Sequence, residues 1–224
     1  MMCYSVESSA KTTLLSLVAI VVMLQSSVSH FKWIGLMLIG WCGMQFAELL
    51  LWLTNPSKSC TSMNKLITLT LIPLVLVSQP LLGLLGSFFV KPWRECNQKR
   101  KLFIVVYSIL SSSVLLLHFF GNRVKDCTTV TPEGHLDWWL SKYQGNKPVA
   151  YVMWLIIISL PIFLLWNTSF NAVIAIFIIP LFGFFYGLRT DTKGSIWCHY
   201  TCYTAIVSVV IYLLYKFKIY NILK

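Results

Sequence analysis

The sequence predicts an all-α membrane protein, a single bundle of seven transmembrane helices. Of its 224 residues, 57% are hydrophobic and 11% are charged, and the mean hydropathy is +0.74. Apolar runs of about 20 residues, long enough to cross the hydrocarbon core of a bilayer, recur between short charged segments. Because a backbone in lipid must satisfy its own hydrogen bonds, such runs indicate helices. The alternating segments of about ten residues that are typical of a membrane β-barrel are missing.

Seven apolar runs are the predicted spans, and together they form one domain, residues 1–224. The first follows Lys11 and has the apolar core of a signal peptide, but no cleavage site and soluble domain follow, so we interpret it as a retained helix. The third contains Pro73 and Pro80, which predict a kink or a tilt. The spans are expected at 12–29, 33–53, 65–90, 101–121, 149–166, 170–188 and 195–215.

Charge distribution predicts the orientation of the bundle. Seven spans place the termini on opposite sides, and Lys and Arg divide evenly between those sides. Charges in short loops weigh most in setting orientation. One such loop, on the C-terminal side, carries Lys91, Arg94, Lys99, Arg100 and Lys101. The acidic residues gather on the N-terminal side: Glu7, Asp126, Glu133, Asp137 and Asp191. We therefore expect the N-terminus outside or in a lumen and the C-terminus in the cytosol.

Cys60 and Cys127 both fall in segments on the N-terminal side, 54–64 and 122–148. An external or lumenal environment would allow a disulfide between them. Spacing alone does not fix the pairing, so two free thiols remain the alternative.

The net charge of +11 raises the question of a nucleic-acid partner. Lys and Arg lie almost entirely outside the apolar runs, which fits membrane flanks and anionic headgroups. No soluble stretch combines aromatic and basic residues into a nucleic-acid platform. The lipid bilayer is therefore the expected partner, and nucleic acid is not.

Glu48 places a carboxylate inside the apolar run 33–53. A charged group at that depth costs roughly 2.5 to 3.5 kcal/mol on insertion scales, so it should face the bundle interior and have a partner. Helical spacing puts Trp41, Gln45, Glu48 and Trp52 on one face and Leu49, Leu50 and Leu53 on others. The first set is predicted to face inward and the leucines to face lipid.

Further polar residues converge with Glu48. Because chain direction alternates from span to span, most of them fall in the membrane half nearest the N-terminal side, and Gln79 lies deeper. The predicted intramembrane polar cluster is Glu48, Asn64, Gln79, His118, Trp197, Cys198 and His199. Hydrogen bonds between helices, worth about 0.6 to 2 kcal/mol each, are the leading interpretation, with Glu48 bonded to a histidine or to Asn64.

A membrane hydrolase or metal protein using Glu48, His118, Cys198 and His199 is an alternative, because zinc accepts such a set of ligands. No pair has the close spacing of a recognised metal motif, and adjacent Cys198 and His199 point about 100° apart on a helix. We therefore assign no metal ligand, catalytic residue or cofactor. A transporter of a small ligand or ion, or a receptor-like protein, is a second alternative.

The longest segment between spans, 122–148, contains His135, Asp137, Trp138 and Trp139. Its two tryptophans are expected to cover the mouth of the bundle or to lie in the membrane interface. This segment is the best candidate for contact with another membrane or virion protein.

Several short motifs resemble those of an uncharacterised family of seven-helix membrane proteins encoded by large double-stranded DNA viruses of algae and other protists. They are Gln45-Phe46-Ala47-Glu48 with Trp52, Asn64-Lys65, Gln79-Pro80 and Gly194-Ser195-Ile196-Trp197-Cys198. The resemblance covers most of the chain. It implies a multi-pass viral protein of a host-cell membrane or a viral inner membrane, and it supplies no catalytic residues.

Overall fold

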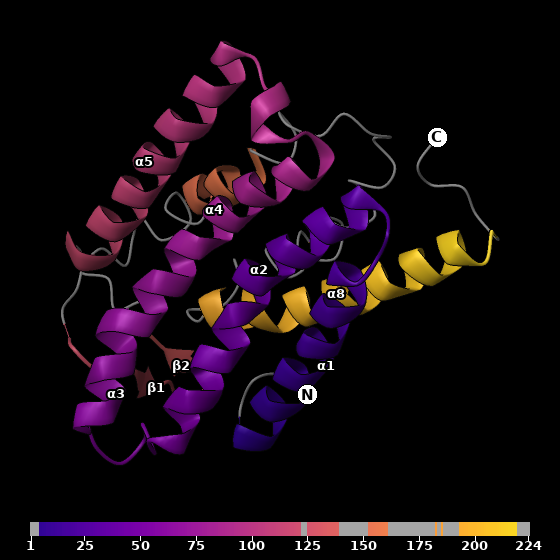
Figure 1. Cartoon of the computed structure of the whole chain (residues 1–224). Helices are drawn as coiled ribbons and strands as arrows, with labels where there is room; N and C mark the ends of the chain where they lie inside the picture. Colours follow the sequence, from indigo (N-terminus) through magenta and orange to yellow (C-terminus); the bar gives the residue numbers. More distant parts are fainter. Residues whose placement is uncertain are drawn as a thin grey trace.

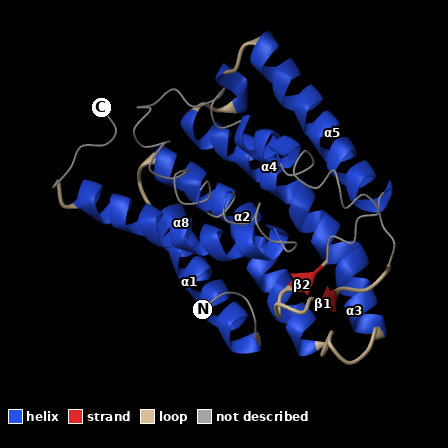
Figure 2. Ribbon diagram, turned by 180° about the vertical axis from the view of Figure 1, so that it is seen from behind, coloured by secondary structure: helices blue, strands red, loops and turns tan. Residues whose placement is uncertain are grey.

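Residues 5–121, 125–138, 152–160, 182, 185 and 193–218 are described by the structure, a computed structural model; for 193–199 the description covers the backbone alone. Helices form most of this part of the chain, and a two-stranded sheet lies at one end beside α3 (Figures 1 and 2). The helices are α1 Val6–Leu24, α2 Ser29–Leu53, α3 Ser62–Leu66, the π-helix η1 Ile67–Leu71, α4 Ile72–Val90, the 3-10 turn η2 Trp93–Glu95, α5 Gln98–Gly121 and α8 Lys193–Lys216. The strands are β1 Thr129–Val130 and β2 Leu136–Asp137.

Four helices in the described chain are long and apolar enough to cross a membrane: α1, α2, the continuous helix Ser62–Val90 and α5. They correspond to the first four predicted spans, so the helical class and the membrane-length helices agree with the sequence. Of the predicted span 149–166, residues 152–160 are helical, and 170–188 lies almost entirely outside the described residues. Within α8, the apolar stretch Tyr200–Lys216 is shorter than the four. The count of seven stays a prediction.

Helix α1, Val6–Leu24, begins before the start and ends before the end of the predicted span 12–29. The residues of α1 that precede the predicted span are mostly polar, so the search for apolar runs does not detect them. Local interactions make them helical: the hydroxyl of Ser5 accepts from the amide of Ser8 at 3.2 Å, and Lys11 pairs with Glu7 at 2.6 Å.

The predicted distortion of the third span takes the form of a π-helix. Across Ile67–Leu71 the turn widens, and the amide of Ile72 donates to the carbonyl of Ile67. Pro73 follows directly. Proline lacks an amide hydrogen and its ring clashes with the carbonyl four residues earlier, so a wider turn relieves the conflict. Pro80 lies inside α4.

Helix α2 packs against α1, α4 and α8 (Figure 1). A side chain at Gly40 would place its Cβ 2.9 Å from the Cα of Gln79, so glycine is required where α2 meets α4. Nearby, the indole of Trp33 donates to the carbonyl of Gly83 at 2.7 Å. The backbones of α2 and α4 therefore approach closely at Gly40.

Burial follows the predicted faces of α2 in part. Trp41, Gln45 and Glu48 are completely buried, whereas Leu53 is 60% exposed. Trp52, predicted to face inward, and Leu49 and Leu50, predicted to face lipid, are all half-buried, and Trp52 and Leu50 pack against the core. Large apolar side chains line the outer faces of α1 and α5, including Leu14, Leu17 and Val18 and then Leu102, Ile109 and Leu117. Such continuous apolar faces suit contact with lipid.

Candidate functional site

Residues 125–138, which we call the cap, fold over one end of the helices (Figure 1). Strands β1 and β2 pair antiparallel, with Thr129 opposite Asp137. The turn between them has Pro132 at its second position, a hydrogen bond of 2.9 Å from the amide of Gly134 to Thr131, and Gly134 at φ 83°. Proline and glycine favour this conformation. Sequence reasoning expected a cover here but not a hairpin.

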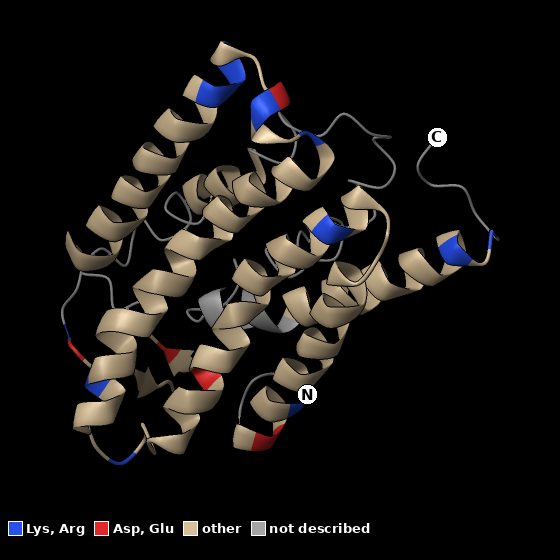
Figure 3. Ribbon diagram, in the orientation of Figure 1, with Lys and Arg blue, Asp and Glu red and all other residues tan. Residues whose placement is uncertain are grey.

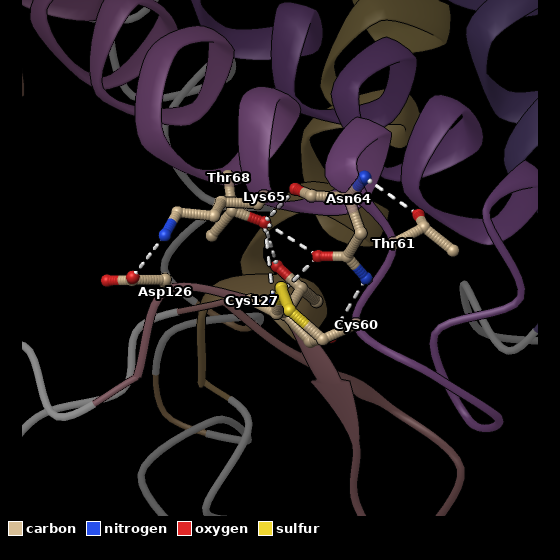
Figure 4. The surroundings of a disulfide bond; sticks show 8 residues. Cys60, Thr61, Asn64, Lys65, Thr68, Asp126 and Cys127 are labelled. Atoms are coloured by element: carbon tan, nitrogen blue, oxygen red, sulfur yellow. Dashed lines mark hydrogen bonds and ion pairs between the residues drawn. A yellow bond between two sulfur atoms is a disulfide. The ribbon is translucent and has the colours of Figure 1, made fainter.

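A disulfide between Cys60 and Cys127 ties the cap to the segment that precedes α3 (Figure 4). The two Cα atoms lie 5.7 Å apart. Beside it, the ammonium of Lys65 and a carboxylate oxygen of Asp126 form an ion pair of 2.6 Å, with both side chains more than half exposed. Of the two alternatives that the sequence leaves open, the structure has the disulfide.

Asn64, labelled in Figure 4, is hydrogen-bonded to Thr128, the residue that follows Cys127 in the chain. Its side chain is buried, donates from Nδ2 to the carbonyl of Thr128 at 3.0 Å and accepts at Oδ1 from the amide of Thr128 at 2.9 Å. The amide group thus pairs with the backbone as a neighbouring strand would. The hydroxyl of Thr68 lies 2.9 Å from that of Thr128 and completes the contact. The expected bond between Asn64 and Glu48 is not formed.

Glu48 anchors the far end of the cap. Its carboxylate is completely buried and accepts at Oε1 from the indole Nε1 of Trp138 at 3.0 Å. Trp138 and Leu136 belong to the same apolar cluster as Leu51 and Phe119, so the cap contributes to the core as well as covering it. Sequence reasoning assigned Trp138 to the mouth or the interface and missed it as the partner of Glu48.

The remaining predicted cluster residues have different surroundings. Gln79 lies deeper and accepts at Oε1 from the indole Nε1 of Trp154 at 2.9 Å. His118 is half-buried on α5. Trp197, Cys198 and His199 lie on the helical backbone of α8, and their side chains lie outside the described part of the chain. Glu48 and Asn64 are therefore each hydrogen-bonded to the cap, and Gln79 forms a separate, deeper hydrogen bond.

A second polar contact joins α2 to α8. The side-chain amide of Gln45 donates to the hydroxyl of Thr201 at 3.0 Å, and the thiol of Cys42 lies 3.8 Å from the carbonyl of Thr201. Thr201, Thr204 and Ser208 are all buried on α8. Sequence reasoning missed this row, although its spacing of three and four residues is the signal of one helix face.

His135 is the buried titratable group of the cap. Its side chain is 4% exposed, and burial lowers the pKa of His135 below its ordinary value, while nearby Glu133 opposes part of that shift. Among the described residues, no group of three or more His, Cys, Asp or Glu side chains could hold a metal ion.

These features define a helical protein with membrane-length helices whose cap is fixed to one end by a disulfide, an ion pair and buried hydrogen bonds. Comparison with protein-family models, with curated proteins and with solved structures finds no match for this chain.

Proposed function

We propose that the protein is a multi-pass integral membrane protein that presents the cap on the outer or lumenal side for recognition by another membrane or virion protein. Four membrane-length helices and their outward apolar faces support the membrane location. The buried polar side chains support a structural role for the interior residues, because Asn64, Glu48 and Gln79 are hydrogen-bonded to segments that they hold in place.

Charge supports the orientation. Figure 3 shows Lys and Arg concentrated at the turn that joins α4 to α5, while most acidic residues lie toward the end that carries the cap. Short basic segments tend to stay in the cytosol. The disulfide lies at the cap end, and disulfides persist in external or lumenal compartments.

The observation that carries the proposal is the fixed position of the cap. A covalent bond at Cys127, two backbone bonds at Thr128 and an indole bond at Trp138 hold both ends of a segment of 14 residues, 125–138. Its tip, Pro132 and Glu133, remains exposed. A surface that is ordered before binding loses less conformational freedom on association, so a fixed tip suits recognition of a protein partner.

Resemblance to the viral family extends the proposal to seven spans in a host-cell or viral inner membrane. Gln45, Glu48, Asn64 and Gln79 carry that resemblance, and all four are buried and bonded to other segments. Residues that fix packing in this way are the ones that a shared fold would need.

Site-specific photocrosslinking tests the proposed role of the cap. A photoreactive residue at Glu133 should give a discrete adduct in the membranes of cells that make the protein. The matched control is Lys58, which is also exposed at the cap end but lies outside the cap. Equal adducts at both positions, or none at Glu133, would contradict a recognition surface on the cap.

A further inference from the structure

The turn between α4 and α5, residues 91–101, which we call the basic turn, gathers unpaired positive charge. Its basic residues are Lys91, Arg94, Lys99, Arg100 and Lys101, and its acidic residue is Glu95. Among the described residues, none of these cations has an ion pair. At the opposite end, Lys11 pairs with Glu7 and Lys65 with Asp126, each at 2.6 Å. Both ion pairs of the described residues therefore lie at the cap end, and Figure 3 shows the basic turn at the opposite end.

The local backbone increases this positive potential. Lys99, Arg100 and Lys101 occupy the first turn of α5, where Asn97 accepts at Oδ1 from the amide of Arg100 at 2.9 Å. A helix start carries about half a positive charge, so cations there repel the dipole as well as one another. The Nε of Arg100 is buried and has no hydrogen-bond partner in the described chain. An anion from outside the protein would relieve this concentration of charge.

The basic turn has a defined shape. The thiol of Cys96 points to the carbonyls of Lys91 and Pro92, at 3.7 and 3.5 Å. Trp93 packs edge-on against Phe88, with ring centroids 5.4 Å apart, and the ammonium of Lys101 lies 5.5 Å from the Trp93 ring centroid. The cations are thus displayed on an ordered turn.

The surroundings place this turn at headgroup depth. Trp93 is 41% exposed, and tryptophan is enriched at the boundary between membrane and water. The next outward side chains along α5, Leu102, Val105 and Val106, are exposed and apolar. The cations therefore lie where headgroups are expected, Trp93 lies at the boundary, and the apolar side chains of α5 lie where acyl chains are expected.

We propose that the basic turn binds the phosphate groups of anionic phospholipids in the membrane that holds the protein. This inference rests on the proposal that α4 and α5 cross a bilayer. A free phosphate shares the chemistry, but the exposed Trp93 and the apolar start of α5 favour a phosphate that carries acyl chains. Each cation near an anionic membrane surface strengthens attraction on the order of fivefold, so several in one turn select anionic over zwitterionic lipid.

Native mass spectrometry of the full chain, purified in micelles with equal amounts of phosphatidylglycerol and phosphatidylcholine, tests the proposal. The wild type should retain phosphatidylglycerol preferentially. Arg94→Gln with Lys99→Gln should reduce that preference several-fold, because both side chains are exposed and support no described packing. The matched control, Lys11→Gln with Lys58→Gln, removes the same charge from two exposed positions at the cap end and should keep the preference.

Two further measurements need no variant. Added sodium chloride should weaken retention of phosphatidylglycerol by the wild type, because screening shortens the range of the attraction. Inorganic phosphate at equal ionic strength should compete no better than chloride. No preference in the wild type, equal loss in both double variants, or specific competition by phosphate would overturn the proposal. The protein is first recovered from the membrane fraction. If it is found there, a negative result contradicts lipid binding by the basic turn and not the proposed membrane location.

Discussion

The indole of Trp138 donates to the carboxylate of Glu48 across 3.0 Å, joining two residues 90 positions apart in the chain. One lies within a membrane-length helix and the other ends the cap. Because Glu48 is completely buried, this bond gives an otherwise costly polar group a structural use. The cap is therefore held from inside the bundle as well as by its disulfide.

Substitutions at Glu48 should show how much of its contribution to stability comes from its hydrogen bond and how much from its size and shape. Glu48→Gln keeps an oxygen that can accept from Trp138, so the fold should be retained. Glu48→Leu leaves the indole N–H without its acceptor and should lower the free energy of unfolding by about 1–3 kcal/mol. Thermal unfolding of the purified protein measures both. Adding Trp138→Phe should have little further effect in the Leu variant, and full additivity would contradict the coupling of the two residues.

Asn64 should be intolerant of changes that remove either half of its amide. Asn64→Leu removes the Oδ1 acceptor of the buried Thr128 amide and leaves the hydroxyl of Thr68, 3.2 Å away, as its remaining acceptor, at a cost of about 1–3 kcal/mol. Hydrogen exchange at Thr128 should then accelerate. As a control, Asn97→Ala removes a bond at the start of α5 and should leave exchange in the cap unchanged. Unaltered protection of Thr128 in the Leu variant would show that Asn64 does not hold the cap.

Two glycines of the same interface should respond differently to alanine. At Gly40 the new Cβ would lie 2.9 Å from the backbone of Gln79, so Gly40→Ala should destabilise the protein by about 1–3 kcal/mol. At Gly83 no atom of the described residues lies within 4 Å of the new Cβ, so Gly83→Ala should be nearly neutral. Thermal midpoints of the two variants compare them directly, and similar midpoints would be evidence against close packing at Gly40.

The cap should lose stability as pH falls. Burial lowers the pKa of His135, so below its ordinary value of 6.5 the unfolded cap takes up a proton that the folded cap does not. Stability is therefore fully present above that value and decreases as pH falls through 6.5 toward the lowered pKa. Hydrogen exchange of the cap at several pH values measures the effect. His135→Gln should flatten the dependence, and Glu133→Gln should steepen it because the opposing carboxylate is lost. A dependence that is unchanged in His135→Gln would assign it to another group.

The sequence predicts correctly those properties that depend on the spacing of residues along a single helix. The inward position of Trp41, Gln45 and Glu48 follows from spacing along a single helix, and the four membrane-length helices follow from apolar runs. The requirement that Glu48 be buried with a partner follows from the cost of charge in lipid. These properties depend on local sequence and on general physics.

The identity of each partner could not be predicted in this way. Trp138 meets Glu48 because the hairpin turns at Gly134 and the disulfide fixes its start, and both depend on tertiary contacts. Thr201 becomes the partner of Gln45 only through the packing of α8 on α2. Spacing within one helix does not specify which segment lies opposite it.

Thiol labelling of the native protein in intact, right-side-out vesicles tests whether the disulfide-tied cap faces outward. A membrane-impermeant reductant is applied first or omitted, a membrane-impermeant maleimide follows, and mass spectrometry locates the label. We expect label on Cys60 and Cys127 after reduction alone, with Cys96 of the basic turn unlabelled. Label on Cys60 and Cys127 without reduction, or only after the vesicles are opened, would contradict this expectation.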